Sequence, residues 1–306
     1  MFVSLAILAA AQQIVVPIGR PRVVEQPRAP IESAGPAWAA ACNGSDDSQK
    51  PAPPVRIHGN TYLVGTCGIS SILITDPAGD VLIDGGTEAD ADLIADNVRK
   101  LGFRVTDIKY LLLSHEHFDH AGGLAKLQRL TGAQLVASPG QAAVLTSGVP
   151  AKDDPQSGVL KPFPPAHVDR VVRNGEMIRV GNIAVTATAT PGHTSGAITW
   201  HWGSCDGGVC RQIVYADSLT PVSAPAYRFT DHPLYVSAFR QSLATVAKLD
   251  CDILLTPHPG ASDMPQRLAL GRPLLDSNAC RDYAAQRTKD LDERLAKEQP
   301  KAKPKK

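Results

Sequence analysis

The stretch His115-Glu116-His117-Phe118-Asp119-His120 is the most informative part of this 306-residue chain. It follows a nearly continuous apolar run, 108–113, which predicts a strand buried on both faces. In an extended loop, His115 and His117 are two residues apart and point to one side, whereas Asp119 and His120 are adjacent and point elsewhere. Imidazole and carboxylate groups are the ligand types expected of zinc. The stretch therefore offers two half-sites and suits two metal ions better than one.

Two later histidines lie in settings that favour the same role. His193 lies in Thr190-Pro191-Gly192-His193-Thr194-Ser195-Gly196, and His258 lies in Leu254-Leu255-Thr256-Pro257-His258-Pro259-Gly260. Each follows an apolar run and lies in a turn rich in Pro and Gly. Either one alone would more often be a capping or packing histidine, but together with the first stretch they make a chance surface cluster improbable. The remaining candidates lack such a setting and receive no function: His58, His167, His201 and His232.

The hydrophobic pattern around these residues predicts an α/β protein. Short β-rich runs predict strands at 62–64, 71–75, 81–84, 178–188, 197–202, 212–215 and 253–255. Helical spacing predicts helices at 88–101, 121–130, 234–248 and 278–297. Residues 138–167 contain many Pro and Gly with little periodicity, and we expect a long surface segment there.

The composition does not favour a nucleic acid or a membrane as a partner. The chain has 43% hydrophobic and 20% charged residues, which is ordinary for a soluble globular protein. Its 31 basic and 30 acidic residues leave a net charge of +1. This balance gives no electrostatic reason to expect nucleic acid or an anionic membrane as a partner.

The two ends of the chain differ from its middle. Residues 1–11 are apolar and end in three alanines, which resembles a secretory signal, although no basic residue precedes the apolar part. A disordered or partly buried N-terminus is the alternative. Residues 12–34 are rich in Pro and Arg and predict a linker, 35–297 form the predicted domain, and 298–306 are a basic tail to which we assign no function.

Six cysteines, an even number behind a candidate signal, favour disulfides over free thiols. Cys205 and Cys210 flank an Asp-Gly-Gly turn and are placed to close a small hairpin loop. A structural zinc site would compete for the thiols, but the chain has no Cys-x-x-Cys pair to begin one.

The three histidine motifs together resemble those of the metallo-β-lactamase superfamily. The marks are His-x-His-x-Asp-His, then Pro-Gly-His-Thr, then a distant single His. The resemblance covers about residues 35–295 and implies a four-layer αββα sandwich with the zinc loops along one edge. The apolar strand ending in Asp84-Gly85-Gly86 fits as well, and in the family this Asp supports the metal loop without ligating.

The stretches 215–220 and 251–262 are similar to the third subclass, B3, of the true β-lactamases. First-subclass relatives have a cysteine where this chain has Ser218. The resemblance therefore implies a first zinc on His115, His117 and His193 and a second on Asp119, His120 and His258. It also implies the disulfides Cys42–Cys67, Cys205–Cys210 and Cys251–Cys280.

The sequence leaves open whether Asp217 or Ser218 faces the metals. In relatives such as glyoxalase II a carboxylate bridges the two metals, and Asp217 aligns with it at an offset of one residue. The subclass likeness instead points Ser218 into the pocket and turns Asp217 away.

The resemblance implies a di-zinc hydrolase that confers antibiotic resistance. The candidate signal and the cysteines predict that it is periplasmic or secreted, and we expect a monomer. It would open the β-lactam ring of penicillins, cephalosporins and carbapenems by attack of a hydroxide held between the zinc ions. Asp119 would be catalytic, and the substrate-binding residues would be Ser218, Thr220 and Gln156.

Two other functions compete with this prediction. A hydrolase of the same fold acting on a thioester, as glyoxalase II does, a lactone or a phosphodiester is the main alternative, because fold does not fix substrate. The export signal, the disulfides and the serine-containing turn disfavour it, and a nuclease would also need a basic face. A zinc-binding protein without catalysis would be favoured by a missing ligand, and all six are present.

Overall fold

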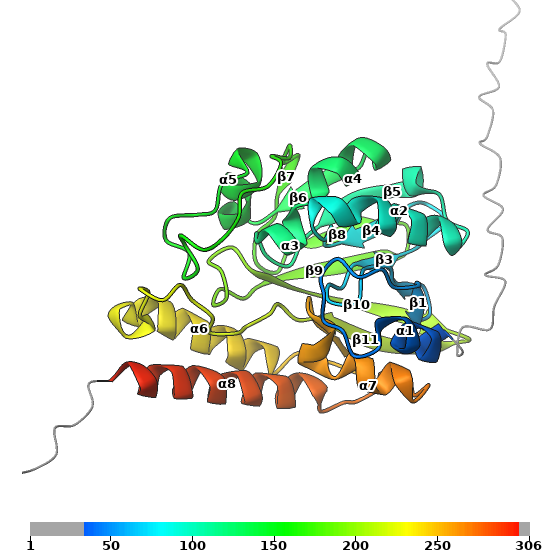
Figure 1. Ribbon diagram of the computed structural model, residues 1–306. Coiled ribbons are helices and arrows are strands. Elements are labelled where there is room, and N and C mark those ends of the chain that lie inside the picture. Colours follow the sequence, from blue (N-terminus) through cyan, green and yellow to red (C-terminus); the bar gives the residue numbers. More distant parts are fainter. Residues whose placement is uncertain (1–33, 300–306) are drawn as a thin grey trace, which may run out of the picture.

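Two β-sheets lie face to face between two layers of helices in the computed structural model, which describes residues 34–299 (Figure 1). Helices α2, α4 and α5 cover the outer face of one sheet, and α6 and α8 cover the other side of the molecule. The predicted αββα sandwich is therefore confirmed. Residues 1–11, the linker up to residue 33 and the tail from residue 300 lie outside the described residues, so the predictions made for them stay predictions.

The first sheet has seven strands in sequence order: β1 Val55–His58, β2 Thr61–Leu63, β3 Ile72–Ile74, β4 Asp80–Ile83, β5 Ile108–Leu112, β6 Gln134–Ala137 and β7 Arg170–Val171. β1 to β4 pair antiparallel, and β4 to β7 pair parallel. The prediction that 108–113 is buried on both faces is only partly right. Lys109 is exposed and Tyr110 is half-buried, whereas Ile108, Leu111 and Leu112 are buried.

The second sheet has the order β12-β11-β10-β9-β8. Its strands are β8 Met177–Val180, β9 Ile183–Ala189, β10 Ile198–Asp206, β11 Val209–Tyr215 and β12 Ile253–Leu255. The single strand predicted at 178–188 was wrong. It is a hairpin that turns at Gly181, whose φ of +53° lies in the left-handed region that glycine adopts easily.

The helices are α1 Ala34–Cys42, α2 Ala91–Lys100, α3 Phe118–Ala121, α4 Leu124–Thr131, α5 Pro139–Ser147, α6 Pro233–Val246, α7 Met264–Ala269 and α8 Ala279–Glu298. The helix expected at 121–130 is interrupted at Gly122 and Gly123. The surface segment expected at 138–167 begins with α5, so that prediction was wrong at its start. Ser138 and Gln141 form a capping box around Pro139, which stabilises the first turn of α5.

The apolar side chains form one cluster between the sheets and one under each helical layer. The central cluster includes Trp200, Trp202 and Tyr215, and it buries their rings almost completely. The outer clusters bury the inner faces of α2 and α4 on one side and of α6 and α8 on the other. This packing holds both sheets rigidly, and the loops at their common edge carry the residues discussed below.

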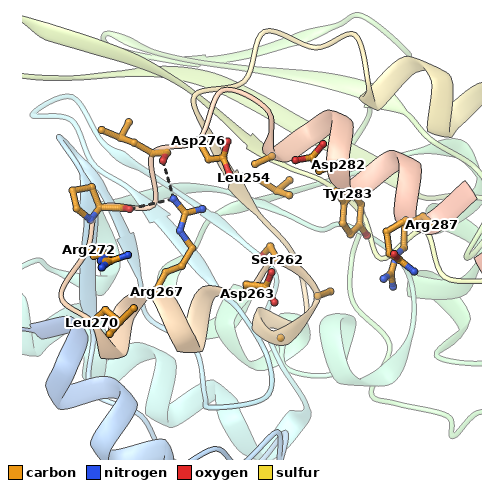
Figure 2. A pocket seen from close by; sticks show the side chains of 16 residues that line it. Leu254, Ser262, Asp263, Arg267, Leu270, Arg272, Asp276, Asp282, Tyr283 and Arg287 are labelled. Atoms are coloured by element: carbon orange, nitrogen blue, oxygen red, sulfur yellow. Dashed lines mark hydrogen bonds between the residues drawn. The ribbon is translucent and has the colours of Figure 1, made fainter. Parts of the chain in front are cut away.

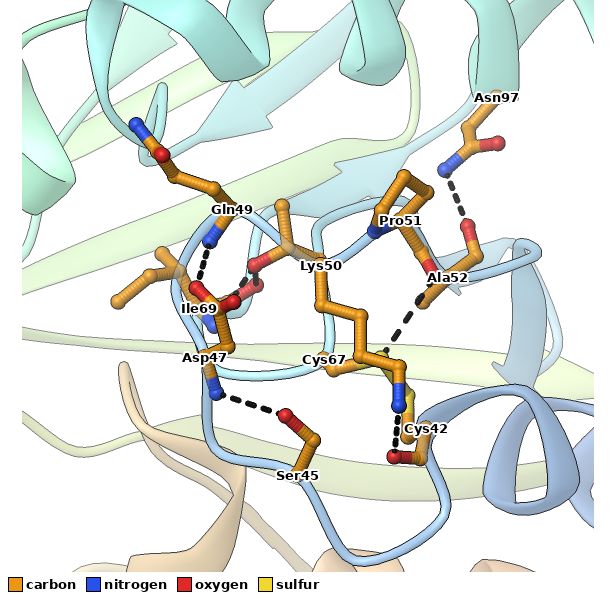
Figure 3. Close-up of a disulfide and its surroundings, with 11 residues drawn as sticks. Cys42, Ser45, Asp47, Gln49, Lys50, Pro51, Ala52, Cys67, Ile69 and Asn97 are labelled. Carbon is orange, nitrogen blue, oxygen red and sulfur yellow. Dashed lines mark hydrogen bonds between the residues drawn. A yellow bond between two sulfur atoms is a disulfide. The ribbon is translucent and has the colours of Figure 1, made fainter.

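Three disulfides join the pairs Cys42–Cys67, Cys205–Cys210 and Cys251–Cys280, the pairing that the resemblance implies. The first ties α1 to the loop after β2. Beside it, Lys50 Nζ, from the segment before β1, donates to the carbonyl oxygen of Cys42 at 2.6 Å (Figure 3). The second closes the β10–β11 hairpin, and the third ties α8 to Cys251, two residues before β12. Between residues 34 and 299, no helix combines the length and apolarity needed to span a bilayer.

Candidate metal centre

Five histidines and one aspartate meet at the edge of the sandwich where several strands end. His115 and His117 lie in the loop between β5 and α3, and Asp119 and His120 lie in α3. His193 follows β9, and His258 follows β12. Strand ends from both sheets therefore bring together residues that are up to 143 positions apart in the sequence.

The first cluster consists of His115, His117 and His193. Their ring centroids are 4.7–4.9 Å apart, and each presents a nitrogen within 4.8 Å of the others. All three side chains are buried.

The second cluster consists of Asp119, His120 and His258. The Nε2 atoms of His120 and His258 are 3.3 Å apart, and they lie 3.4 and 3.6 Å from Asp119 Oδ2. The two clusters adjoin each other, because a ring nitrogen of His115 also lies within 4.8 Å of potential ligand atoms of Asp119 and His120. The structure thus brings all six side chains together at one edge, and their division between two metal ions stays a prediction.

Each histidine has one ring nitrogen turned to a protein oxygen and the other turned into the cluster. The partners lie 2.8–3.3 Å away and are Asp217 Oδ1 for His115, Asp154 Oδ2 for His117, Thr220 O for His193, Asp84 Oδ2 for His120 and Gly68 O for His258. This is the arrangement that orients metal-ligating histidines. His115 Nε2 is buried and has no hydrogen-bond partner among the described residues. A buried imidazole nitrogen without a partner is costly, so the donor set fits a bound metal ion.

The electrostatics of the site suit a cation. Burial, with the neighbouring histidines, lowers the pKa of His193 to about 3 and that of His115 well below its usual value, so both rings are neutral at pH 7. Burial opposes the charge of His120, but Asp119 and Asp84 outweigh it and raise the pKa of His120 to about 10. Without metal, Asp119 and His120 thus form an ion pair whose proton a metal ion would displace.

Asp84 anchors the start of the histidine loop. Its carboxylate is fully buried and accepts hydrogen bonds from Ser114 N at 2.6 Å, Ser114 Oγ at 2.7 Å and the hydroxyl of Tyr215 at 2.6 Å. The residue has a φ of +64°, which turns the chain sharply at the end of β4. These contacts agree with the role that the resemblance implies for Asp84, which is to support the metal loop without ligating.

The side chains of the adjacent residues Asp217 and Ser218 have different surroundings. The Asp217 carboxylate accepts a hydrogen bond from His115 Nδ1 and therefore lies behind that ring, on the side away from the first cluster. Ser218 Oγ is buried without a hydrogen-bond partner among the described residues. Thr220 Oγ1 lies 3.0 Å from His193 Nδ1, and Gln156 Nε2 lies 3.4 Å from His193 Nε2. The three residues predicted to bind substrate thus lie at or beside the site, and their roles stay predictions.

Sequence reasoning missed two supporting carboxylates. Asp154, in the segment before β7, is 4% exposed and holds His117. Glu116 joins two motifs, because its carboxylate accepts from Thr194 Oγ1 at 2.8 Å and from Gly196 N at 3.2 Å. The position of Glu116 inside the histidine stretch was a usable signal, whereas nothing local marks Asp154.

Comparison with known proteins gives three informative similarities. Residues 64–258 match the family described as the metallo-beta-lactamase superfamily. The solved structure of the MIM-2 metallo-beta-lactamase is 52% identical, with a TM-score of 0.84 over 87% of this chain and 98% of that one. The structure of MEM-A1, a subclass B3 metallo-beta-lactamase from a soil metagenome library, is 44% identical, with a TM-score of 0.80 over 82% of this chain and 98% of that one.

A more distant similarity concerns a different activity. The hydroxyacylglutathione hydrolase of Methylobacterium nodulans is 33% identical over 103 residues, which are 34% of this chain and 31% of that protein. The match thus spans about a third of this curated relative, whereas the structural matches above span almost the whole of each neighbour.

Proposed function

Because the chain belongs to the metallo-β-lactamase superfamily, we propose that it is a zinc-dependent β-lactamase that hydrolyses penicillins, cephalosporins and carbapenems and so confers antibiotic resistance. The observation that carries the proposal is the pair of adjoining clusters, in a fold that matches subclass B3 enzymes almost end to end. Fold alone would not suffice, since one fold serves several substrates.

Two zinc ions would be held by three side chains each. The first cluster, His115, His117 and His193, offers only neutral imidazoles, and the second, Asp119, His120 and His258, adds one carboxylate. Zinc bound here would supply Lewis acidity, which lowers the pKa of water to about 7 and polarises a carbonyl group. No serine nucleophile and no acyl-enzyme are needed.

The protein residues would orient the reactants. Asp119 is 19% exposed, and its carboxylate accepts a hydrogen bond from the attacking water and so fixes its direction. Ser218 and Thr220 donate hydrogen bonds to the carboxylate that β-lactams carry, directly or through water. Gln156, whose Nε2 lies 3.4 Å from His193 Nε2, would also contact the substrate.

A thioester hydrolase is the second candidate, and the similarity to hydroxyacylglutathione hydrolase favours it. That similarity covers about a third of each chain. The position of Asp217 behind His115 also argues against the candidate, because it does not supply the bridging carboxylate that such relatives have. The β-lactamase is therefore the better-supported function.

We also propose that the protein is exported to the periplasm or the medium and acts there as a monomer. The three disulfides support this location, since disulfides persist in oxidising compartments. The apolar residues 1–11 would be the signal that is removed.

Carbapenem hydrolysis by the purified protein, with and without a chelator, tests the proposed activity. We expect turnover that the chelator abolishes and that added zinc restores. Turnover that survives complete metal removal would contradict the proposal, as would the absence of turnover by protein shown to contain zinc.

A further inference from the structure

The turn that follows β11, residues 217–220, supports two of the three histidines of the first cluster. Asp217 holds His115 through its carboxylate, and the carbonyl oxygen of Thr220 accepts from His193 Nδ1 at 3.0 Å. The turn contains a residue in the left-handed region, Leu219, with a φ of +43°. Such backbone is unfavourable for leucine and persists only where its surroundings hold it in place.

Tyr283, on α8, provides that restraint. Its hydroxyl donates to the carbonyl oxygen of Asp217 at 2.7 Å and also contacts that of Ser218, so one proton is shared between two consecutive carbonyls. Tyr283 is 5% exposed, and burial raises the pKa of its hydroxyl, which therefore remains a donor. Removing the hydroxyl would leave both buried carbonyls short of a partner.

The tyrosine itself is fixed from both sides along α8. Cys280 lies one helical turn before it and is linked to Cys251, so the helix is bonded covalently to the chain that leads through β12 to His258. Arg287 lies one turn after it, with its guanidinium 5.5 Å from the centre of the Tyr283 ring. Tyr283 and Arg287 line a cavity of about 800 Å³. Figure 2 shows both side chains projecting from α8.

We propose that Tyr283 is a positioning residue for the first cluster: by clamping the turn 217–220 it sets the two oxygens that orient His115 and His193. The path runs from the Tyr283 hydroxyl to the Asp217 carbonyl, and from the Asp217 carboxylate to His115. This inference rests on the proposed zinc site, but it does not depend on the identity of the substrate.

Zinc affinity of the first cluster tests the proposal. Replacing both His120 and His258 by Ala removes two of the three side chains of the second cluster, so the zinc that remains reports on the first. In that background, Tyr283→Phe should raise the zinc Kd about tenfold in competition with a chromophoric chelator, the lower end of the effect of outer partners on metal affinity. Tyr62→Phe is the matched control, because it also removes a buried tyrosine hydroxyl but lies on β2, away from the turn. We expect it to leave the Kd within about twofold.

An unchanged Kd for Tyr283→Phe, or an equal rise for Tyr62→Phe, would overturn the proposal, since either result describes a merely structural hydroxyl. If Tyr283→Phe does not fold, the paired variant Cys251→Ser with Cys280→Ser releases α8 without removing the hydroxyl. This paired variant should raise the same Kd. An unchanged Kd would overturn the proposal. Because the readout is zinc binding, it remains valid even if wild-type protein fails to hydrolyse β-lactams.

Discussion

Replacing Asp84 by Asn isolates the charge that holds the histidine loop. Asn has the same shape and tolerates the left-handed conformation, so the φ of +64° adds no strain. The Asp84 carboxylate accepts three hydrogen bonds, two from Ser114 and one from Tyr215, and it lies 3.3 Å from His120 Nδ1. An amide can accept through only one of its two terminal atoms, and its NH₂ group then faces donors.

The cost follows from these contacts. A hydrogen bond to a charged acceptor contributes about 1.5–3 kcal/mol, and a neutral one about 0.5–1.5 kcal/mol. Losing about 1 kcal/mol at each of three hydrogen bonds predicts a fall of about 3 kcal/mol in the free energy of unfolding. The variant also leaves His120 without its outer carboxylate, which should weaken zinc binding at the second cluster about 10–100-fold.

Denaturant unfolding of the metal-free protein and chelator competition measure the two effects of Asp84→Asn. Asp80→Asn is the control, because Asp80 is also fully buried but is the first residue of β4, whereas Asp84 directly follows the end of that strand. It should affect stability while leaving zinc affinity unchanged. A destabilisation by Asp84→Asn below about 1 kcal/mol, or zinc affinities equal in the two variants, would refute the reasoning.

Three further predictions concern separate parts of the molecule. Asp119→Asn should lower kcat at least about 100-fold while zinc analysis still finds the metal, because the amide is a poorer acceptor for the attacking water; near-normal kcat would contradict this role. Replacing Cys251 and Cys280 by Ser opens a loop of 29 residues and should lower the free energy of unfolding, measured with denaturant, by about 3.6 kcal/mol. An unchanged free energy of unfolding would contradict the presence of this disulfide. Burial lowers the pKa of His201, so below pH 6.5 the unfolded chain binds more protons there than the folded protein does. Wild-type stability should therefore fall relative to His201→Gln as the pH drops from 7 to 5, and parallel pH profiles would disprove the shift.

The six side chains that meet at the candidate site could be predicted from the sequence because their signals are local. The stretch from His115 to His120 sets residue types and spacing within six positions, directly after a strand. His193 and His258 follow apolar runs in turns rich in Pro and Gly. The rule that ligands gather at strand ends then sufficed to predict that these residues lie together. Their division into two sets of three came from the resemblance.

The supporting oxygens could not be predicted in this way. Asp154 and His117 are 37 positions apart, and Asp217 and His115 are 102 apart, so their contacts depend on how the loops pack in three dimensions. The clamp by Tyr283 likewise requires the position of α8 against the second sheet.

Local signals were also overlooked in the fold. Ser138, Pro139 and Gln141 form a helix start that the density of Pro and Gly in 138–167 concealed. The turn at Gly181 divided a run whose composition suited one long strand. In both places a short capping or turn motif decided the structure against the average character of the surrounding sequence.

The central claim is tested most directly by offering the zinc-loaded protein four substrates side by side: a carbapenem, a cephalosporin, a glutathione thioester and an acyl-lactone. The comparison of kcat/KM should show ring opening of both lactams exceeding thioester and lactone hydrolysis by orders of magnitude. Dominant turnover of the thioester or the lactone would contradict the β-lactamase function, although the metal centre and the fold would stand.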